Sequence, residues 1–265
     1  MLKQRVLTAL VIAPLALVLL FGLDGGAYAC FVGLIVLASG WEWANLAGAE
    51  SSKEKAGYVG LLLAGLVLLW VTASAQATWP LLLSLVCWML ALYWVARYPQ
   101  AREQWQGQTR RYILGFFILL PCWVGFMQLR ETPWWLFYVL FVVWGADVGA
   151  YFAGRAFGNR KLAPRVSPGK SWAGVYGGLA MTVVLALIMA GFQQIGLGGA
   201  LWLVTISLIV ALSSVVGDLL ESMLKRHRGV KDSGNLLPGH GGLLDRIDSL
   251  TAAIPLFALL APWVS

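Results

Sequence analysis

The chain has 265 residues, of which 60% are hydrophobic and 12% are charged. A soluble globular domain is about 45–50% apolar and about 25% charged, so this composition excludes a soluble domain and indicates an all-α, polytopic membrane protein. The formal net charge is +7, and basic residues accumulate in the cytoplasmic loops of membrane proteins. We therefore expect no nucleic-acid partner, although a basic soluble protein would suggest one.

Long apolar runs predict about nine membrane-spanning helices, because each span requires about 20 mostly apolar residues. The first run follows Lys3 and Arg5, and we interpret it as an uncleaved span. A signal peptide ending near Ala27-Tyr28-Ala29 is the alternative, which would remove one helix and leave the orientation of the others unchanged. The predicted spans are 6–22, 27–47, 58–76, 79–96, 112–129, 133–153, 172–192, 200–222 and 249–264.

The connections between these spans alternate in charge, and the alternation predicts the topology. Those at 48–57, 97–111, 154–171 and 223–248 are basic, whereas the others are short and nearly uncharged. With the N-terminus in the cytoplasm and the C-terminus outside, all but Arg130 of the 19 Lys and Arg residues face the cytoplasm. This distribution is typical of proteins that follow the positive-inside rule.

Acidic residues inside the predicted spans mark candidate functional positions, since charge is costly within a membrane. Asp147 and Asp218 lie near the cytoplasmic ends of the sixth and eighth spans, and Glu221 lies one turn beyond Asp218. We expect Asp147 to bind a metal ion or to orient a substrate or a cation. Glu42 lies between two tryptophans, and we interpret it as a structural residue.

Asp245 and Asp248 lead into the ninth span and, being three residues apart, can share one helix face. With Asp218 they would meet at one membrane depth, where carboxylates repel each other unless a cation compensates. Oxygen ligands select hard ions such as Mg²⁺, which also takes phosphate oxygens from substrates. We therefore predict that these three aspartates bind Mg²⁺. The alternative is structural ion pairing with Lys225, Arg226 or Arg246.

The segment from Gly154 to Gly174 is rich in glycine, proline and basic residues, which predicts a non-helical loop. Ser167 and Lys170 come just before the seventh span, and the N–H groups at a helix start favour phosphate. We predict that both residues bind substrate phosphate, with ordinary loop charge as the alternative. A P-loop is excluded because Pro164 occupies the position of that motif's first glycine.

His240 precedes Gly241 and Gly242, where a flexible backbone permits close approach to a ligand. We predict that these three residues contribute to substrate binding, and a local hydrogen-bonding role is the alternative for His240. General-base catalysis is not required here, because a phosphate nucleophile is already ionised at neutral pH.

Fixed polar positions recur between Ser222 and Asp248. They are Ser222, Lys225-Arg226, Lys231-Asp232, His240-Gly241-Gly242 and Asp245-Arg246-Ile247-Asp248. This pattern closely resembles the signature of the phosphatidate cytidylyltransferases, also called CDP-diacylglycerol synthases, and it is highly specific.

The similarity to this family extends upstream over roughly the C-terminal half of the chain. Its segments are Asp147–Tyr151, Ser167–Trp172 and Gly217–Ser222, with Ser171 where the family usually has Thr. We therefore treat 111–265 as the catalytic region and 1–110 as transmembrane helices of uncertain role, within one membrane-embedded unit.

The resemblance implies that the protein converts CTP and phosphatidic acid to CDP-diacylglycerol and pyrophosphate, in phospholipid biosynthesis. It implies a site on the cytoplasmic side of a bacterial inner membrane, in contact with membrane lipids. Mg²⁺ on Asp218, Asp245 and Asp248 would bridge the nucleotide phosphates. Lys225, Arg226 and Lys231 would hold the triphosphate and pyrophosphate, and Ser222 belongs with the substrate-binding residues. Ser167, Lys170 and Arg246 would position substrate phosphates.

Other functions remain open at this point. A CTP-dependent lipid kinase would share the topology but transfer the γ-phosphoryl group, and it should lack the full Ser222–Asp248 pattern. A transporter would place its acids near the bilayer midplane, and a catalytically inactive scaffold would not need the charged set. The sequence also leaves open a monovalent cation such as K⁺ beside Mg²⁺, and a homodimer.

Overall fold

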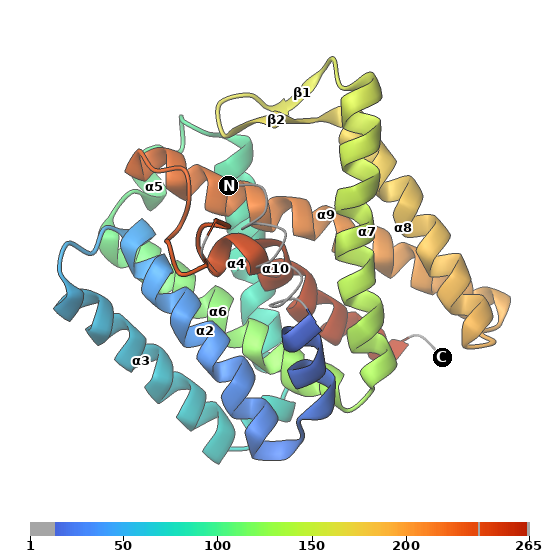
Figure 1. Cartoon of the computed structure of the whole chain (residues 1–265), viewed down its shortest axis with the longest axis horizontal. Coiled ribbons are helices and arrows are strands. Elements are labelled where there is room, and N and C mark those ends of the chain that lie inside the picture. Colours follow the sequence, from blue (N-terminus) through green and yellow to red (C-terminus); the bar gives the residue numbers. More distant parts are fainter. Residues whose placement is uncertain (1–13, 238, 264–265) are drawn as a thin grey trace.

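The protein is almost entirely helical, as the sequence predicts. The computed structural model describes residues 14–237 and 239–263 (Figure 1). Its principal helices are 14–22, α2 (Gly25–Ala47), α3 (Ser52–Val71), α4 (Trp79–Ala96), α5 (Arg102–Trp105), α6 (Gln108–Arg130), α7 (Pro133–Phe157), α8 (Trp172–Phe192), α9 (Leu197–Arg228) and α10 (Leu244–Leu260). Two 3₁₀ turns, Ser74–Gln76 and Ala261–Trp263, and two strands, β1 (Lys161–Ala163) and β2 (Ser167–Ser171), complete the described elements.

Among the described residues, seven helices are long and apolar enough to cross a membrane, namely α2, α3, α4, α6, α7, α8 and α9. An integral membrane protein with several spans is therefore confirmed. The predicted span 6–22 lies partly outside the described residues, which show a helix over 14–22. The prediction of nine spans with the N-terminus inside and the C-terminus outside stays a prediction.

The predicted bounds of the helix at 249–264 are corrected. This helix, α10, begins at Leu244 and has 17 residues, so Asp245 and Asp248 lie inside its first turns rather than ahead of it. At about 1.5 Å per residue, α10 is about 26 Å long, which is shorter than a hydrocarbon core of about 30 Å. It is also the central helix of the molecule, packed against α9, α6, α4 and α7.

Other helix ends differ from the prediction where polar residues continue the helix. α3 begins six residues early, because the side chain of Ser51 accepts a hydrogen bond from Glu54 N at 3.2 Å and caps it. α9 runs six residues past the predicted end to Arg228, and it stops at Gly229, whose φ of 69° is left-handed. The predicted bounds of α4 and α8 match the structure.

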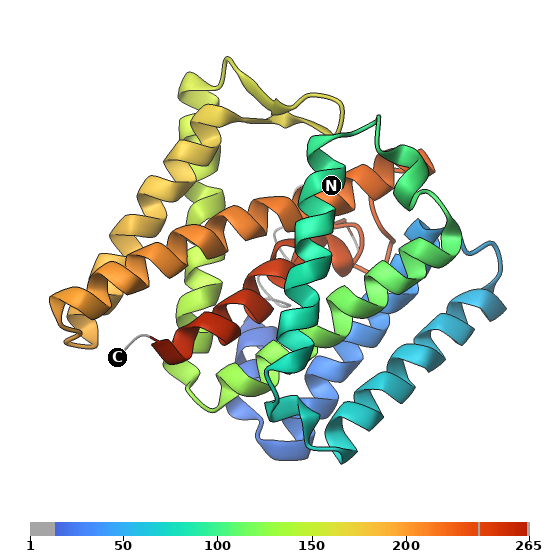
Figure 2. The ribbon, with the colours of Figure 1, turned by 180° about the vertical axis from the view of Figure 1, so that it is seen from behind.

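The helices form two groups joined by α9. Figures 1 and 2 show α7 and α8 side by side on one flank, whereas α2, α3, α4 and α6 lie together on the other. α9 crosses from the far end of α8 to the second group, where α10 packs against it. The functional residues predicted on α7, α9 and α10 are thus brought into one neighbourhood.

Small residues allow the closest helix contacts. A Cβ at Gly149 of α7 would lie 2.9 Å from the Cβ of Met181 and 2.5 Å from the carbonyl oxygen of Gly177 on α8. A Cβ at Gly217 of α9 would lie 2.5 Å from the carbonyl oxygen of Asp248. Close approach at small residues is a common way for membrane helices to pack, and here it brings the backbone next to Asp218 against the backbone of Asp248.

The predicted basic loop forms a hairpin. β1 and β2 are antiparallel, with Lys161 opposite Ser171 and Ala163 opposite Ser167. Ser171 then caps α8 by accepting a hydrogen bond from Gly174 N at 3.2 Å. Arg226 Nε donates to the carbonyl oxygen of Val166 at 3.2 Å, which ties the hairpin to the end of α9.

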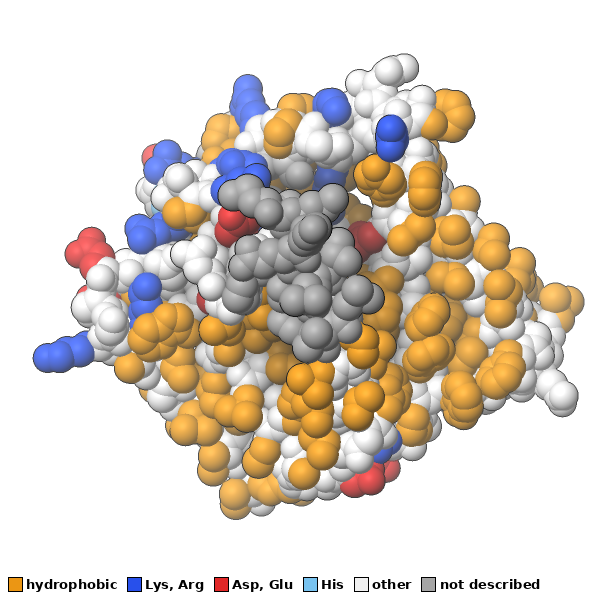
Figure 3. All heavy atoms as spheres, viewed as in Figure 1, with side chains coloured by type: hydrophobic (Ala, Val, Ile, Leu, Met, Phe, Trp, Pro, Cys, Tyr) orange, Lys and Arg blue, Asp and Glu red, His pale blue; other side chains and the backbone are white. Residues whose placement is uncertain are grey.

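The surface is divided between charged and apolar regions. Figure 3 shows most Lys and Arg side chains at the end that carries the hairpin, while hydrophobic side chains cover much of the rest of this face. Many large apolar side chains, such as those of Val71 and Leu197, are exposed. Such surfaces are liabilities in water but suit contact with lipid.

Candidate active site

A cleft of about 380 Å³ lies between α7, α8, α9 and the hairpin. Its polar side chains include Asp147 from α7, Lys170 from β2 and Asp218 from α9. Tyr151 and Arg155 of α7 also line it, and Arg155 Nη1 donates to the Tyr151 hydroxyl at 3.2 Å. Small and apolar residues supply most of the remaining wall, among them Ala146, Ala150, Leu162, Gly174, Val175, Gly178, Leu179, Ala211, Leu212 and Val215. The cleft can therefore hold a ligand with a charged part and an apolar part.

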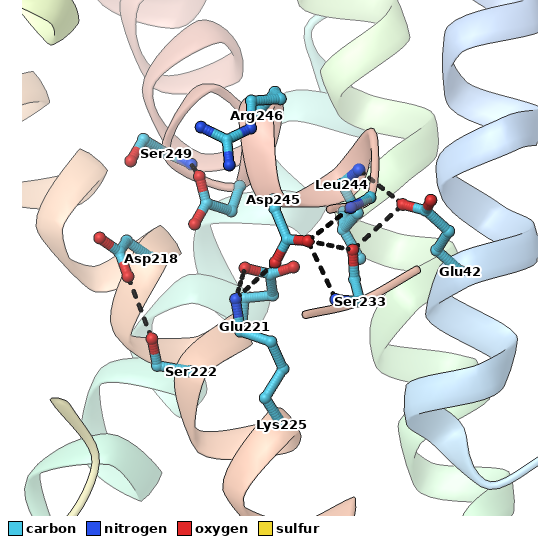
Figure 4. A network of polar contacts seen from close by, with 12 residues as sticks. Glu42, Asp218, Glu221, Ser222, Lys225, Ser233, Leu244, Asp245, Arg246 and Ser249 are labelled. Atoms are coloured by element: carbon cyan, nitrogen blue, oxygen red, sulfur yellow. Dashed lines mark hydrogen bonds and ion pairs between the residues drawn. The ribbon is translucent and has the colours of Figure 1, made fainter. Parts of the chain in front are cut away.

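An ion pair occupies the polar end of this cleft. Lys170 Nζ lies 2.6 Å from Asp218 Oδ2, with side chains 24% and 32% exposed. Ser222, one turn further along α9, donates to Asp218 Oδ1 at 3.1 Å (Figure 4). The structure thus brings together four predicted site residues: Asp147, Lys170, Asp218 and Ser222. Ser167 is not among the cleft residues, because it lies at the other end of β2.

A second polar cluster lies on a neighbouring face of α9, where that helix packs against α10. Lys225 Nζ lies 2.7 Å from Glu221 Oε2 and 2.6 Å from Asp245 Oδ1 (Figure 4). The side chains of Glu221 and Asp245 are only 2% and 6% exposed. A lysine between two buried carboxylates compensates their charge, so the alternative of ion pairing with Lys225 holds for Asp245. Glu221 is noted in the sequence only as an acid within a span.

Asp245 also organises the loop between α9 and α10. Its Oδ2 atom accepts hydrogen bonds from Ser233 N and Ser233 Oγ, both at 3.0 Å, and from Gly242 N at 2.8 Å. Gly241 has a φ of 84°, a conformation that favours glycine. This glycine therefore lets the loop fold back onto the first turn of α10.

The remaining signature residues are spread over the last turn of α9, the loop and the first turn of α10. Arg246 Nη2 donates to the carbonyl oxygen of His240 at 2.6 Å. His240 Nδ1 is buried without a hydrogen-bond partner among the described residues. Lys231 and Arg226 are exposed. The exposed side chains of Arg226, Lys231 and Arg246 are accessible to a ligand, but they do not line the cleft that contains Lys170.

The predicted metal trio is not assembled in this structure. Within residues 14–237 and 239–263, no three Asp, Glu, His or Cys side chains form a group that could hold a metal ion. Asp218 and Asp245 are instead paired with different lysines. Asp248 Oδ1 accepts a hydrogen bond from Ser249 N at 2.7 Å, and the backbone of Asp248 packs against Gly217, the residue before Asp218. Since Mg²⁺ typically requires only one or two carboxylates beside waters and phosphate oxygens, the donor set of Asp218 and Asp248 fits this ion.

Glu42 contributes to this region although the sequence places it in a helix of uncertain role. The side chain is 4% exposed, and its oxygens accept hydrogen bonds from Leu243 N, Leu244 N and Ser233 Oγ. These contacts agree with the structural role expected for Glu42. The only sequence signal for this residue is an acid within an apolar span, which does not identify its partners.

Comparisons with known proteins agree with the residue pattern. A model of the cytidylyltransferase family matches residues 3–263. A phosphatidate cytidylyltransferase of Pseudomonas aeruginosa is 50% identical over 266 residues, which cover 98% of this chain and 97% of that protein. One of Haemophilus influenzae is 40% identical over 282 residues, covering 97% of this chain and 98% of that protein. A phosphatidate cytidylyltransferase of Bacillus subtilis is 42% identical over 158 residues, which cover 56% of this chain and 58% of that protein. The chain therefore belongs to the cytidylyltransferase family.

Proposed function

We propose that the protein transfers the cytidylyl group of CTP to phosphatidic acid, forming CDP-diacylglycerol and pyrophosphate. Relatives that match nearly its whole length are named phosphatidate cytidylyltransferases. The observation that carries the proposal in this chain is the cleft that joins the Lys170–Asp218 pair to an apolar wall. A lipid with a phosphate headgroup has the same division of charge and apolar surface.

The proposed reaction requires positioning more than proton transfer. A phosphate oxygen of phosphatidic acid forms a bond to the α-phosphorus of CTP, and the bond between this phosphorus and the β-phosphate oxygen breaks. The nucleophile is already ionised and pyrophosphate leaves as an anion. Phosphoryl-type transfer of this kind depends mainly on alignment and on stabilising charge. The cations around the cleft and the loop would supply that stabilisation.

The lysines and arginines have two kinds of role in this proposal: some bind phosphate, and one holds carboxylates in position. Lys170 would bind substrate phosphate in the cleft, and the exposed Arg226, Lys231 and Arg246 would bind the outer phosphates of CTP. Lys225 is already held between two buried carboxylates. Its proposed role is therefore to fix Asp245 and Glu221, which differs from the phosphate contact expected from the sequence.

We further propose that Asp218 and Asp248 hold Mg²⁺. The bound ion would neutralise negative charge on the phosphate oxygens during transfer. Lys170, which now pairs with Asp218, would then be released to a substrate phosphate. Asp245 could bind the metal ion only if its ion pair with Lys225 broke. We therefore propose that Asp245 chiefly holds the loop between α9 and α10 in place.

The location of the site follows from the substrates. CTP is available on the cytoplasmic side of a membrane, and we propose that the end carrying the hairpin faces the cytoplasm of a bacterium. The gathering of Lys and Arg side chains at this end supports this orientation (Figure 3). Phosphatidic acid would enter from the adjacent leaflet, and a homodimer is compatible with this arrangement.

The function is tested with purified protein in mixed micelles containing phosphatidic acid, Mg²⁺ and CTP labelled separately on its α- and γ-phosphates. We expect the α-label to enter the lipid and pyrophosphate to be released. Transfer of the γ-label to an added polyprenol, with CDP left behind, would instead identify a lipid kinase. The absence of both transfers in folded protein would contradict the proposal and favour a transporter or a scaffold.

A matched pair of variants shows whether transfer depends on the cleft. Asp218→Asn removes the carboxylate beside Lys170 and should eliminate most α-label transfer. Asp24→Asn changes an aspartate that pairs with Arg130 at 2.6 Å, at the opposite end of α2 from Glu42. It should leave the transfer rate unchanged. Equal rates in the two variants would contradict the assignment of the cleft.

A further inference from the structure

We propose that Glu42, acting with Ser233, is a positioning residue of the active site. This inference rests on the proposed function of Asp245 and Asp248. It gives a site role to α2, a helix outside the region that carries the signature. Three features of the structure support this role: the contacts at the start of α10, a shared hydroxyl group and two glycines.

The carboxylate of Glu42 holds the start of α10. Glu42 Oε2 accepts a hydrogen bond from Leu244 N at 2.7 Å, and Oε1 accepts one from Leu243 N at 3.1 Å. These donors are 202 and 201 residues away in the sequence. The first N–H groups of a helix lack partners within the helix, and a negative charge beside them is favourable. Glu42 therefore caps α10 from another helix.

Ser233 links Glu42 to Asp245. Its hydroxyl oxygen lies 3.1 Å from Glu42 Oε2 and 3.0 Å from Asp245 Oδ2, and the residue is fully buried (Figure 4). A serine hydroxyl has one proton, so it can donate fully to only one of the two carboxylates at a time. The position of either carboxylate consequently affects the hydrogen bond of the other.

Two glycines leave room for this arrangement. A Cβ at Gly242 would lie 2.5 Å from Glu42 Oε2, and one at Gly234 would also collide with the Glu42 carboxyl group. The backbone N–H of Gly242 meanwhile donates to Asp245 at 2.8 Å. The absence of a side chain at Gly242 thus allows the carboxylates of Glu42 and Asp245 to approach its backbone. The sequence alone predicts instead that Gly242 allows a ligand to approach.

These contacts explain how Glu42 would act on the reaction. Asp245 and Asp248 lie in the first turns of α10, so a shift of its N-terminus moves both side chains together. Glu42 touches that terminus directly and touches Asp245 through Ser233. It would therefore set the position of Asp248 relative to Asp218 on α9 without itself contacting a substrate.

The decisive variant is Glu42→Gln, because a carboxamide keeps the size but has one acceptor oxygen instead of two. Either Leu243 N–H or Leu244 N–H then faces an NH₂ group. We expect kcat for α-label transfer, per folded protein, to fall at least tenfold, with a higher Mg²⁺ concentration needed for half-maximal rate. Glu54→Gln is the matched control, since Glu54 is exposed at the start of α3 and should keep the wild-type values.

Ser233→Ala provides an independent test that leaves both carboxylates in place. We expect a several-fold loss of kcat, and almost no further loss when this change is added to Glu42→Gln, because both act through one hydrogen-bond chain. It also serves as the test if Glu42→Gln does not fold.

Two results would overturn the inference. One is a loss of total activity that is explained by the smaller amount of folded protein alone. The molecules that remain folded would then have the wild-type kcat and Mg²⁺ dependence. The other is strict additivity of the two substitutions. Absence of α-label transfer in the wild-type protein would be a different outcome, because it would overturn the proposed function and the Glu42 role with it.

Discussion

The two polar clusters beside α9 are built from the same chemical groups but in opposite environments. In the cleft, Lys170 and Asp218 form one ion pair whose side chains are 24% and 32% exposed, next to open volume. Against α10, Lys225 lies between Glu221 and Asp245, whose side chains are nearly inaccessible. The exposed pair can exchange its partners for a ligand, whereas the buried cluster holds a fixed geometry. This contrast supports the proposal that the first cluster binds ligands and the second holds the site in position.

Lys225→Ala should show the difference between the clusters most clearly. Removing this lysine leaves two buried carboxylates without their cation, which typically destabilises a protein by about 3–5 kcal/mol. The matched Lys170→Ala change breaks a partly exposed pair and should alter stability by about 1 kcal/mol or less. Thermal unfolding in detergent measures both. Equal shifts in Tm would contradict the division into a buried and an open cluster.

Asp218→Asn should do the reverse and impair activity without unfolding the protein. Loss of one preorganised charged group typically lowers kcat by about 100- to 1000-fold, and we expect a loss in that range. Removal of Mg²⁺ with a chelator should abolish transfer in the wild-type protein, and added Mg²⁺ should restore it. Metal-independent transfer would contradict the proposed Mg²⁺ site.

Gly177→Ala tests the packing of α7 against α8, the two helices that flank the cleft, rather than the charges of the cleft. The new Cβ would lie 2.7 Å from the carbonyl oxygen of Gly149, so α7 and α8 must separate. Overpacking of this kind costs about 1–3 kcal/mol and should lower activity by displacing Asp147. Gly191→Ala on the same helix meets open space and is the control. Similar unfolding temperatures for the two variants would show that the close helix contact is unimportant.

Ser222→Ala should have a smaller effect. It removes one hydrogen bond to Asp218, and a bond of this kind contributes about 1 kcal/mol. That energy corresponds to about a fivefold lower kcat. Ser213→Ala, which removes a hydroxyl that donates to its own helix at Val210, is the control on α9. A Ser222 variant with wild-type kcat would remove this residue from the site.

The sequence predicts the helices well where apolar runs end at clear signals. α4 and α8 match their predicted bounds, because the first follows Thr78 with Pro80 in its first turn and the second follows the cap Ser171. Hydropathy misses polar helical turns, so it predicts a loop around Lys225 where the structure has the end of α9. It also cannot show that a helix as short as α10 lies at the centre of the molecule.

The cleft was more predictable than the buried cluster. The sixth and eighth predicted spans run in the same direction, and Asp147 and Asp218 each lie ten residues before the C-terminal end of their helix, so a shared depth follows from topology. The partners of Glu42 cannot be predicted from topology. They lie about two hundred residues away and are backbone N–H groups, which carry no sequence signal. The choice of lysine for each aspartate also depends on side-chain packing, which a pattern of residues does not encode.

The Lys170–Asp218 pair has a consequence for the order in which ligands bind. A phosphate that takes Lys170 and a cation that takes Asp218 must each separate the same two charges, which lie 2.6 Å apart. Once the first ligand has separated them, the second binds without that cost. By thermodynamic linkage, each ligand then raises the affinity for the other by the same factor. If lipid phosphate and Mg²⁺ bind here as proposed, the ion pair would make them cooperative ligands, and each one alone would bind more weakly.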